Sequence, residues 1–160
     1  MDFQDRVPAK KLRKMEDALE FVATFCCGLF FGGALFTSLV QHPAALETGA
    51  DFAARFFGPM YRRAAPLQAG LALAGFAAGI AAWWNGAGRL WLAAALLVGG
   101  AVPFTLLVIQ PVNGALLAGD RGAHERGALL VRWGRLHWPR TAAGGLAFAA
   151  CLCALLRRGA

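Results

Sequence analysis

Residues 126–140 (RGALLVRWGRLHWPR) are the part of the sequence where polar side chains recur with helical regularity in an apolar context. At about 100° per residue, one side of a helix there carries Trp133, His137 and Arg140 together. An indole, an imidazole and a guanidinium that lead into the apolar run 141–156 are what a polar pocket at the mouth of a membrane bundle needs. The same residues also fit an interfacial helix, whose arginines contact lipid headgroups and whose tryptophan lies in the aromatic belt.

The composition places the chain in a membrane. Apolar residues make up 58% of the 160 residues and the mean hydropathy is positive, which leaves too little polar surface for an ordinary soluble protein. The net charge of +7 comes largely from basic residues at the ends of apolar runs, which fits anionic lipid better than nucleic acid. No zinc finger, basic zipper or aromatic RNA-binding motif occurs. We therefore predict membrane lipid, and no nucleic acid, as a partner.

Four apolar runs are long enough to cross a hydrocarbon core of about 30 Å as helices. We therefore predict an all-α protein, an integral membrane up-and-down four-helix bundle. A basic amphipathic segment at residues 1–17 precedes a transmembrane domain at residues 18–158, and interfacial helices are expected in the two long loops. The predicted spans are residues 21–40, 64–84, 90–109 and 139–156.

Prolines set two of the expected helix ends. The pair His42-Pro43 is expected to end the first span, because the residue before a proline is pushed out of the helical region. Pro139 could lie in the first turn of the last span, or it could kink a longer helix that starts near Glu125.

Small residues recur at helical spacing in the first and second spans, in Gly-x-x-x-Gly pairs at Gly28 and Gly32 and at Gly75 and Gly79. Such pairs let a neighbouring helix approach closely, and a homo-oligomer through these faces is one expectation. The four cysteines lie inside apolar runs without a Cys-x-x-Cys pair. We interpret them as small buried hydrophobic residues and not as a disulfide framework.

The predicted topology brings most polar side chains to one membrane face, because the two long connections lie on the same side. Polar groups near hydrocarbon are costly unless they are paired or turned inward, so their convergence favours a pocket. Structural alternatives exist: the histidines can simply be hydrogen-bonded at the interface, Asn113 can cap the turn after Pro111, and Gln68 can join two helices. The candidate site residues are His42, Tyr61, Arg62, Gln68, Gln110, Asn113, Trp133, His137 and Arg140.

The sequence itself requires no cofactor. His42 and His137 have no Cys, Asp or Glu at ligand spacing, so they give only a weak indication of a metal site. A haem or a metal ion between these two histidines stays open on the sequence alone.

Short motifs across the predicted spans resemble a bacterial membrane family of unknown function that also contains the fungal anthrone oxygenases. The likeness covers about residues 21–156, nearly the whole chain. The resemblance implies four transmembrane helices and, for some members, oxygenation of the central methylene of a tricyclic anthrone to a quinone. It rests on residues 38–43 (SLVQHP), residues 61–63 (YRR) with Gln68, residues 103–105 (PFT), residues 111–113 (PVN), Trp133, Leu136-His137 and Arg140-Thr141.

Such an oxygenation suggests roles for the candidate residues. An anthrone methylene is acidic because its carbanion is an aromatic phenolate, so an oxygenase without an obvious cofactor needs a base and donors for the oxyanion. The remaining polar candidates, Arg62, Gln68 and Gln110, are expected to contact the substrate. The assignment is His137 or His42 as the base, Arg140 and Asn113 as the donors, and Trp133 or Tyr61 as the ring that stacks on the substrate.

Two hypotheses about function follow, and the sequence leaves open whether the protein is an enzyme at all. The first is an integral membrane oxygenase or oxidoreductase whose apolar aromatic or quinone-like substrate enters from lipid. The second is a non-catalytic membrane module that binds a lipid, a haem or metal ion, or a partner transmembrane helix. We further expect a multi-pass protein of the plasma (inner) membrane with both termini in the cytoplasm and the pocket open on the outer face. The first span has several basic residues before it and none directly after it.

Overall fold

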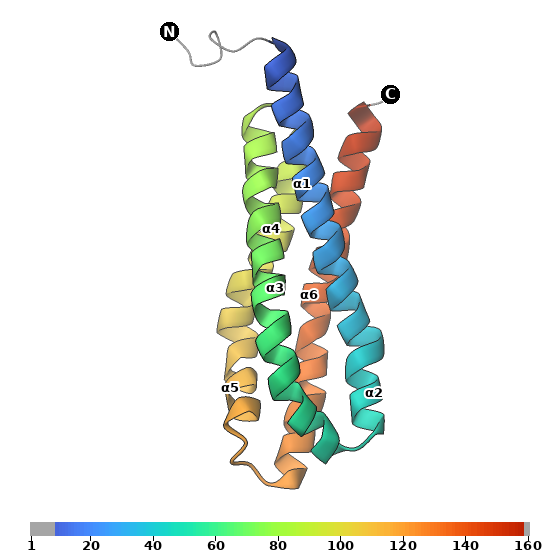
Figure 1. Ribbon diagram of the computed structural model, residues 1–160, viewed down its shortest axis with the longest axis vertical. Helices are drawn as coiled ribbons and strands as arrows, with labels where there is room; N and C mark the ends of the chain where they lie inside the picture. The colour runs from blue at the N-terminus through green and yellow to red at the C-terminus, as the bar shows by residue number, and fades with distance from the viewer. Residues whose placement is uncertain (1–8, 159–160) are drawn as a thin grey trace.

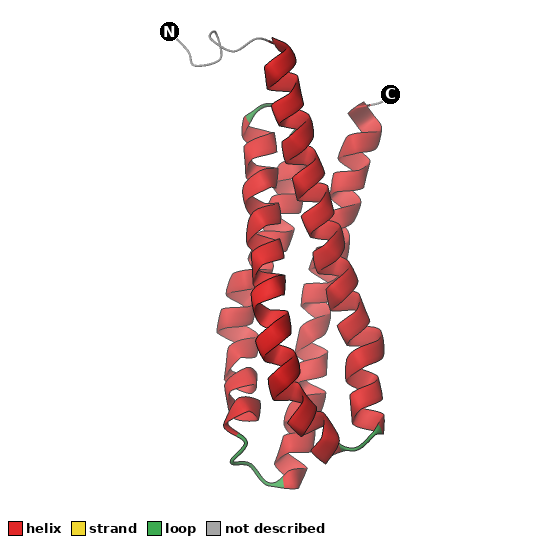
Figure 2. Cartoon of the chain, viewed as in Figure 1, coloured by secondary structure: helices red, strands yellow, loops and turns green. Residues whose placement is uncertain are grey.

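The computed structural model describes residues 9–158, which form helices joined by short turns and contain no strand (Figures 1 and 2). Four long helical units lie side by side. Two of them are interrupted by a short π-helical segment. In chain order the elements are α1 (Ala9–Phe36), η2 (Thr37–Gln41), α2 (His42–Glu47), α3 (Ala50–Trp84), α4 (Arg89–Phe104), η3 (Thr105–Ile109), α5 (Gln110–Ala118) and α6 (Ala123–Arg158).

The helical units pack in chain order as an up-and-down bundle. α1 packs against α3 and α6, and α4 packs against the same two helices, so the four units close a ring. The start of α1 and the end of α6 lie at the same end of the bundle (Figure 1). Each unit contains a stretch long and apolar enough to cross a membrane. The prediction of an all-α multi-pass bundle is therefore confirmed.

The two connections that were expected to be long are largely helical. Only residues 48–49 separate α2 from α3, and only residues 119–122 separate α5 from α6. The expectation of separate interfacial helices in these loops is wrong, because the segments extend the spanning helices instead. Positive φ angles at Gly49 (116°) and Gly119 (69°) make the turns, whereas Pro59 lies inside α3 on an exposed position. At about 1.5 Å per residue, helices of this length exceed the hydrocarbon thickness.

Prolines do not end the first and third units, because a π-turn precedes each of them. The amide of His42 donates to the carbonyl of Thr37, and the amide of Gln110 donates to that of Thr105, both over five residues. These wider turns make room for Pro43 and Pro111, whose rings would otherwise clash with a carbonyl one turn back. The prediction that His42-Pro43 ends the first span is therefore wrong. Both segments share the pattern Thr-x-Leu-Val-x-His/Gln-Pro.

The structure also places Pro139, the amphipathic segment and the cysteines. Pro139 lies within α6, so of the two alternatives the longer helix is the one observed. Residues 9–17 of the amphipathic segment belong to α1, and its first eight residues lie outside the described part of the chain. Cys26, Cys27 and Cys151 are buried free thiols, as expected, whereas Cys153 is exposed.

The glycines of the second predicted pair are used inside the bundle. A Cβ atom on Gly79 would lie 3.0 Å from the Cβ of Ala95 in α4, and one on Gly75 would lie 3.3 Å from the Cβ of Cys26 in α1. Gly28 faces the ring of Phe148 in α6 in the same way, whereas Gly32 has open space beside it. Three of the four glycines therefore serve contacts within one chain, and a homo-oligomer through these faces stays a prediction.

Two apolar clusters fill the bundle at different heights. The cluster toward the chain termini is built around Trp91, Phe30 and Val98 with many alanines, and includes Cys27 and Cys151. The cluster toward the turns 48–49 and 119–122 is built around Phe57, Ile109, Val112, Leu116, Leu130 and Trp133. The polar side chains discussed below lie between these clusters.

Arg158 joins the last helix to the first at the end where α1 begins. Its guanidinium donates to Glu20 (2.6 Å), Asp17 (3.1 Å) and Glu16 (3.1 Å) of α1. Glu20 is only 1% exposed, and its Oε1 has no hydrogen-bond partner among the described residues. The sequence gives no indication of this cluster, because Glu20 directly precedes the first predicted span and Arg158 follows the last.

We expect Arg158→Ala to lower the free energy of unfolding by about 1–2 kcal/mol, because it removes the one side chain among residues 9–158 that donates to the buried Glu20 carboxylate. The effect should be measured as a shift in the thermal or denaturant midpoint in detergent. Arg157→Ala is the matched control, since this neighbouring arginine is exposed and forms no ion pair within residues 9–158. Equal midpoints for the two variants would show that the cluster does not stabilise the bundle.

Candidate functional site

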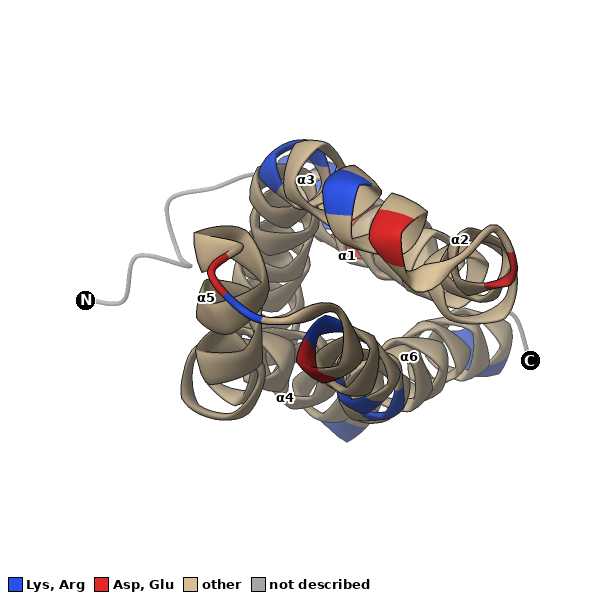
Figure 3. Ribbon diagram, turned by 90° about the horizontal axis from the view of Figure 1, so that it is seen from below, with Lys and Arg blue, Asp and Glu red and all other residues tan. Residues whose placement is uncertain are grey.

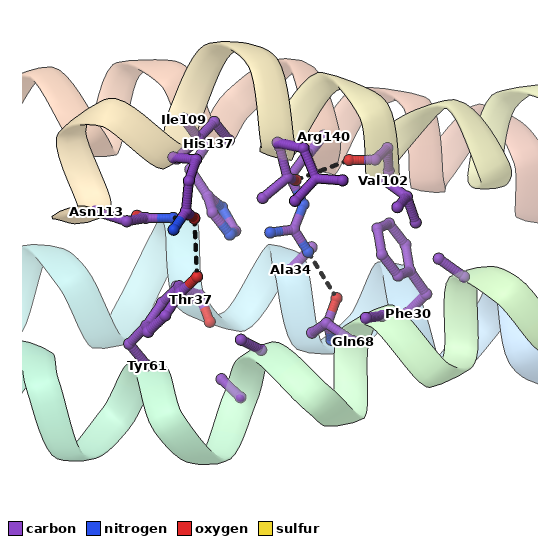
Figure 4. Close-up of a pocket in the computed structure, with 18 of the residues that line it drawn as sticks. Phe30, Ala34, Thr37, Tyr61, Gln68, Val102, Ile109, Asn113, His137 and Arg140 are labelled. Atoms are coloured by element: carbon purple, nitrogen blue, oxygen red, sulfur yellow. Dashed lines mark hydrogen bonds between the residues drawn. The ribbon is translucent and has the colours of Figure 1, made fainter.

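A cavity of about 160 Å³ lies inside the bundle between the two apolar clusters (Figure 4). All four helical units contribute to its wall. Most of the wall is apolar, and a small set of polar side chains converges on it, as is typical of sites for small molecules. The polar lining residues are Thr37, Tyr61, Gln68, Thr105, Gln110, Asn113, His137 and Arg140; the aromatic ones are Phe30, Tyr61 and Trp133.

His137 is held by a chain of hydroxyl groups. The side chain is 5% exposed, and its Nδ1 lies 2.9 Å from the hydroxyl of Ser38 in η2. The Ser38 hydroxyl lies 2.9 Å from that of Thr141, one turn along α6. The Thr141 hydroxyl in turn lies 3.3 Å from the carbonyl of His137 and 3.4 Å from that of Ala34.

The direction of the bonds in this chain depends on where Thr141 sends its single hydrogen. Carbonyl oxygens only accept, so when Thr141 donates to one of the two carbonyls, Ser38 donates to Thr141. Nδ1–H of His137 then donates to Ser38. In this arrangement neutral His137 carries its proton on Nδ1 and has a free lone pair on Nε2. Because His137 lines the cavity and Nε2 has no hydrogen-bond partner among the described residues, this nitrogen is available as a base there.

Arg140 brings a positive charge into the cavity that no acidic residue of the described chain neutralises. One Nη donates to the amide oxygen of Gln68 in α3 at 3.2 Å, and the guanidinium lies 5.3 Å from the ring centre of Phe30. Its Nε is buried and has no hydrogen-bond partner within residues 9–158. A charge inside a membrane bundle is costly unless it is paired, so this guanidinium favours an anionic ligand.

A second hydrogen-bond network connects α6, α5 and α3 across the cavity. Nε1 of Trp133 donates to the amide oxygen of Asn113 at 2.8 Å, and the Asn113 amide donates to the side-chain oxygen of Gln110 at 3.2 Å. The Tyr61 hydroxyl donates to the same Gln110 oxygen at 3.1 Å. Because an indole only donates, the orientation of the Asn113 amide is fixed. Asn113 thus holds the wall together, with one N–H left for a ligand.

His42 and Arg62 lie outside the cavity wall. The indole of Trp133 packs against both imidazoles, with its ring centre 5.0 Å from that of His42 and 4.9 Å from that of His137. His42 instead packs closely against Gly134, where a Cβ atom would lie 2.7 Å from its ring. Arg62 is exposed on α3. Residues 9–158 contain no group of three or more His, Cys, Asp or Glu side chains at ligand distances.

The cavity differs from the pocket expected at a membrane face. Toward the turns, the bundle is filled by the cluster around Phe57, Trp133 and Leu130, so the cavity does not open along the bundle axis on that side. The physical reason is that the connecting segments continue as helices and pack their apolar faces together.

Several contributors were not identified from the sequence. Ser38 and Thr141 were part of the family motifs but received no role. The spacing of His137 and Thr141, four residues apart on one helix, could have indicated that they share a face. Nothing in the sequence places Ser38 against them, because this contact depends on how the π-turn of η2 rotates the first unit.

The fold and the cavity together define a class: a four-helix membrane protein with an internal cavity lined by a buried histidine and by an arginine that has no acidic partner among residues 9–158. The sequence model of the anthrone oxygenase family matches residues 57–150, which is more than half of the chain, and the protein belongs to this family. The matched range contains every polar residue of the cavity except Thr37. No curated protein and no solved structure matches the chain.

Proposed function

We propose that this protein is a membrane-embedded oxygenase that oxidises an apolar aromatic or quinone-like molecule in the cavity. The observation that carries the proposal is the pairing of a free His137 Nε2 with an unneutralised Arg140 guanidinium in one largely apolar site. A substrate that becomes an oxyanion when it loses a proton uses both groups at once. The membership of the anthrone oxygenase family supports the same class of reaction.

The chemistry balances with dioxygen as the only co-reactant. Nε2 of His137 takes a proton from the ring methylene, and the electron pair of the broken C–H bond moves through the ring to its oxygen, next to Arg140. Dioxygen then adds to the carbon and gives a hydroperoxide after protonation. Loss of water from the hydroperoxide forms the carbonyl, so that CH2 and O2 become C=O and H2O, and His137 is again neutral.

Trp133 and Tyr61 remain candidates for stacking on the flat ring, and Gln68, Gln110 and the free N–H of Asn113 for hydrogen bonds to its oxygens. Arg62 and His42 act, at most, from outside the cavity wall. His42 supports Trp133 by packing against its indole.

The direct test is turnover by the purified protein in detergent, with anthrone as the probe. We expect oxygen uptake and formation of anthraquinone, followed with an oxygen electrode and by absorbance. The control is the same detergent solution without protein, because anthrones oxidise slowly by themselves. Turnover no faster than the control, from a colourless protein with tightly bound phospholipid, would favour the non-catalytic membrane module instead.

We further propose that the protein lies in the plasma membrane with both termini in the cytoplasm. The basic residues Lys10, Lys11, Arg13 and Lys14 near the start of α1 support this orientation. The opposite end carries charges of both signs on α3, α6 and the turns, as seen in Figure 3, and includes the ion pair of Arg126 with Asp51 at 2.8 Å.

This orientation predicts that a reporter active only in the cytoplasm works when fused to Ala160. It also predicts that a cysteine placed at Ala123 is labelled by a membrane-impermeant reagent in intact cells or spheroplasts. An inactive reporter together with an unlabelled position 123 would mean that the bundle is inverted.

A further inference from the structure

The cavity is closed along the bundle axis in both directions. Trp91, Phe30 and Val98 fill the interior toward the termini, and Phe57, Trp133 and Leu130 fill it toward the turns. The side chains that face the cavity from α1 and α6, including Ala34 and His137, are largely buried. A ligand must therefore enter between two helices.

The wall is open between α3 and the third helical unit. Among the lining residues, Ala69 of α3, Leu106 of η3 and Gln110 of α5 are exposed, and Ala65 and Thr105 are partly exposed. In Figure 4 the labelled side chains lie between these two helical units, with α1 and α6 behind them. The α3 side of this opening consists of alanines at positions 64, 65 and 69, which leave room where larger side chains would close it.

The surface around the opening is apolar. Leu106, which lines the opening, is 62% exposed, and Leu107 next to it in the chain is 78% exposed. Neither residues 64–84 of α3 nor residues 90–109 of α4 and η3 include a charged side chain. Such a surface belongs in hydrocarbon, so the opening leads to the lipid and not to water.

The size of the cavity limits what can lie next to His137 and Arg140. Its volume of about 160 Å³ is close to that of an engineered apolar cavity of about 150 Å³ that accommodates benzene. Three fused rings need more than twice the room of one. One ring therefore fits fully inside, and the rest of a larger ligand must extend through the opening.

We propose that the substrate is a lipid-resident phenol with a single ring and an apolar tail, which enters sideways between α3 and η3. This inference rests on the function proposed above for the same site. The ring hydroxyl reaches Arg140 and His137, and the tail stays against Leu106 and Leu107 in the acyl-chain region. The oxidation of a phenol has the same stoichiometry as that of an anthrone. The phenol reacts with one O2 at the carbon para to its hydroxyl and gives a quinone and H2O.

The test measures binding without oxygen, so that it does not depend on turnover. Radiolabelled 3-pentadecylphenol is added to the protein in phospholipid nanodiscs, and specific binding is taken as the part displaced by unlabelled compound. We expect saturable binding, with phenol itself and anthrone each competing at least ten-fold more weakly. Anthrone competing as well as or better than pentadecylphenol would overturn the inference.

The opening itself is tested by filling it. We expect Ala69→Trp to slow association of the labelled compound at least ten-fold and Ala69→Leu to slow it less. Leu73→Trp is the control, because Leu73 lies one turn further along α3, is exposed and does not line the cavity. An unchanged association rate in both Ala69 variants, with folding checked by circular dichroism, would overturn the sideways entry.

The outcomes separate this inference from the proposed function. Tight binding of the alkylphenol without any oxygen uptake overturns the proposed function. It supports the inference that the cavity takes a single-ring phenol with an apolar tail as its ligand. Turnover of anthrone without specific binding of the alkylphenol overturns the substrate class and supports the proposed function.

Discussion

His137→Gln is expected to lower kcat by about 10²–10⁴-fold, the usual contribution of a general base. Glutamine fills nearly the same space and can still reach the Ser38 hydroxyl, but it has no nitrogen that can take up a proton. The Kd for a substrate analogue without oxygen should change much less, because the Arg140 guanidinium is still present. The measurement is steady-state oxygen uptake together with anaerobic binding.

His124→Gln is the matched control for this experiment. His124 lies in the first turn of the same helix, is exposed and does not line the cavity. We expect its kcat to equal that of the natural protein. If His137→Gln kept more than half of the natural kcat, the assignment of His137 as the base would be wrong, whatever the effect on binding.

The helical spans could be predicted from the sequence because they depend on a property of each segment alone. The runs without charged residues give the number of crossings, and the short segment Asn85–Arg89 requires neighbouring antiparallel helices. The end predicted at His42-Pro43 was wrong for the opposite reason. Whether a proline ends a helix depends on whether the carbonyl one turn back can be moved aside. In this bundle the π-turn of η2 moves that carbonyl aside, and the helix continues past Pro43.

The site residues divide in the same way into those that one helix positions and those that depend on contacts between helices. Trp133, His137 and Arg140 could be placed on one face because they share a helix, and the structure does place all three on the cavity wall. His42 lies on another helix, and its position depends on the rotation of the chain after η2. Ser38, inside η2, lies beside His137, whereas the ring of His42 packs against Gly134. No local pattern in the sequence carries this information, because the π-turn shifts every residue after it to a different face.

The three alanines at the opening to lipid illustrate a further limit. Alanine on a helix in a membrane protein usually means close packing between helices. Here Ala72 and Ala78 of α3 are buried in that way, but Ala69 on the same helix is exposed beside the cavity. Sequence alone does not distinguish an alanine that admits a neighbouring helix from one that leaves room for a ligand.

Arg140→Leu is expected to reduce kcat/KM by about 10²–10³-fold, as the loss of a donor to a developing oxyanion does in other enzymes. At the same time the thermal midpoint should stay the same or rise. The guanidinium has no acidic partner within the described chain and one buried Nε without a hydrogen bond, so an apolar side chain of similar size removes a cost of folding. The two measurements are steady-state turnover and thermal unfolding of the same purified sample.

The opposite signs of these effects distinguish a binding residue from a structural one. A structural arginine loses stability together with activity when it is replaced, whereas a charge kept in an apolar site for its ligand lowers stability until the ligand binds. Arg135→Leu provides the matched control on the same helix, because Arg135 is exposed and does not line the cavity; both quantities should stay unchanged. A substrate analogue that carries an oxyanion should also raise the midpoint of the natural protein and not that of Arg140→Leu, since only the former gains a paired charge on binding. If Arg140→Leu instead unfolded at a clearly lower temperature and the analogue stabilised both proteins equally, Arg140 would be part of the scaffold, and the anion would have to bind elsewhere in the cavity.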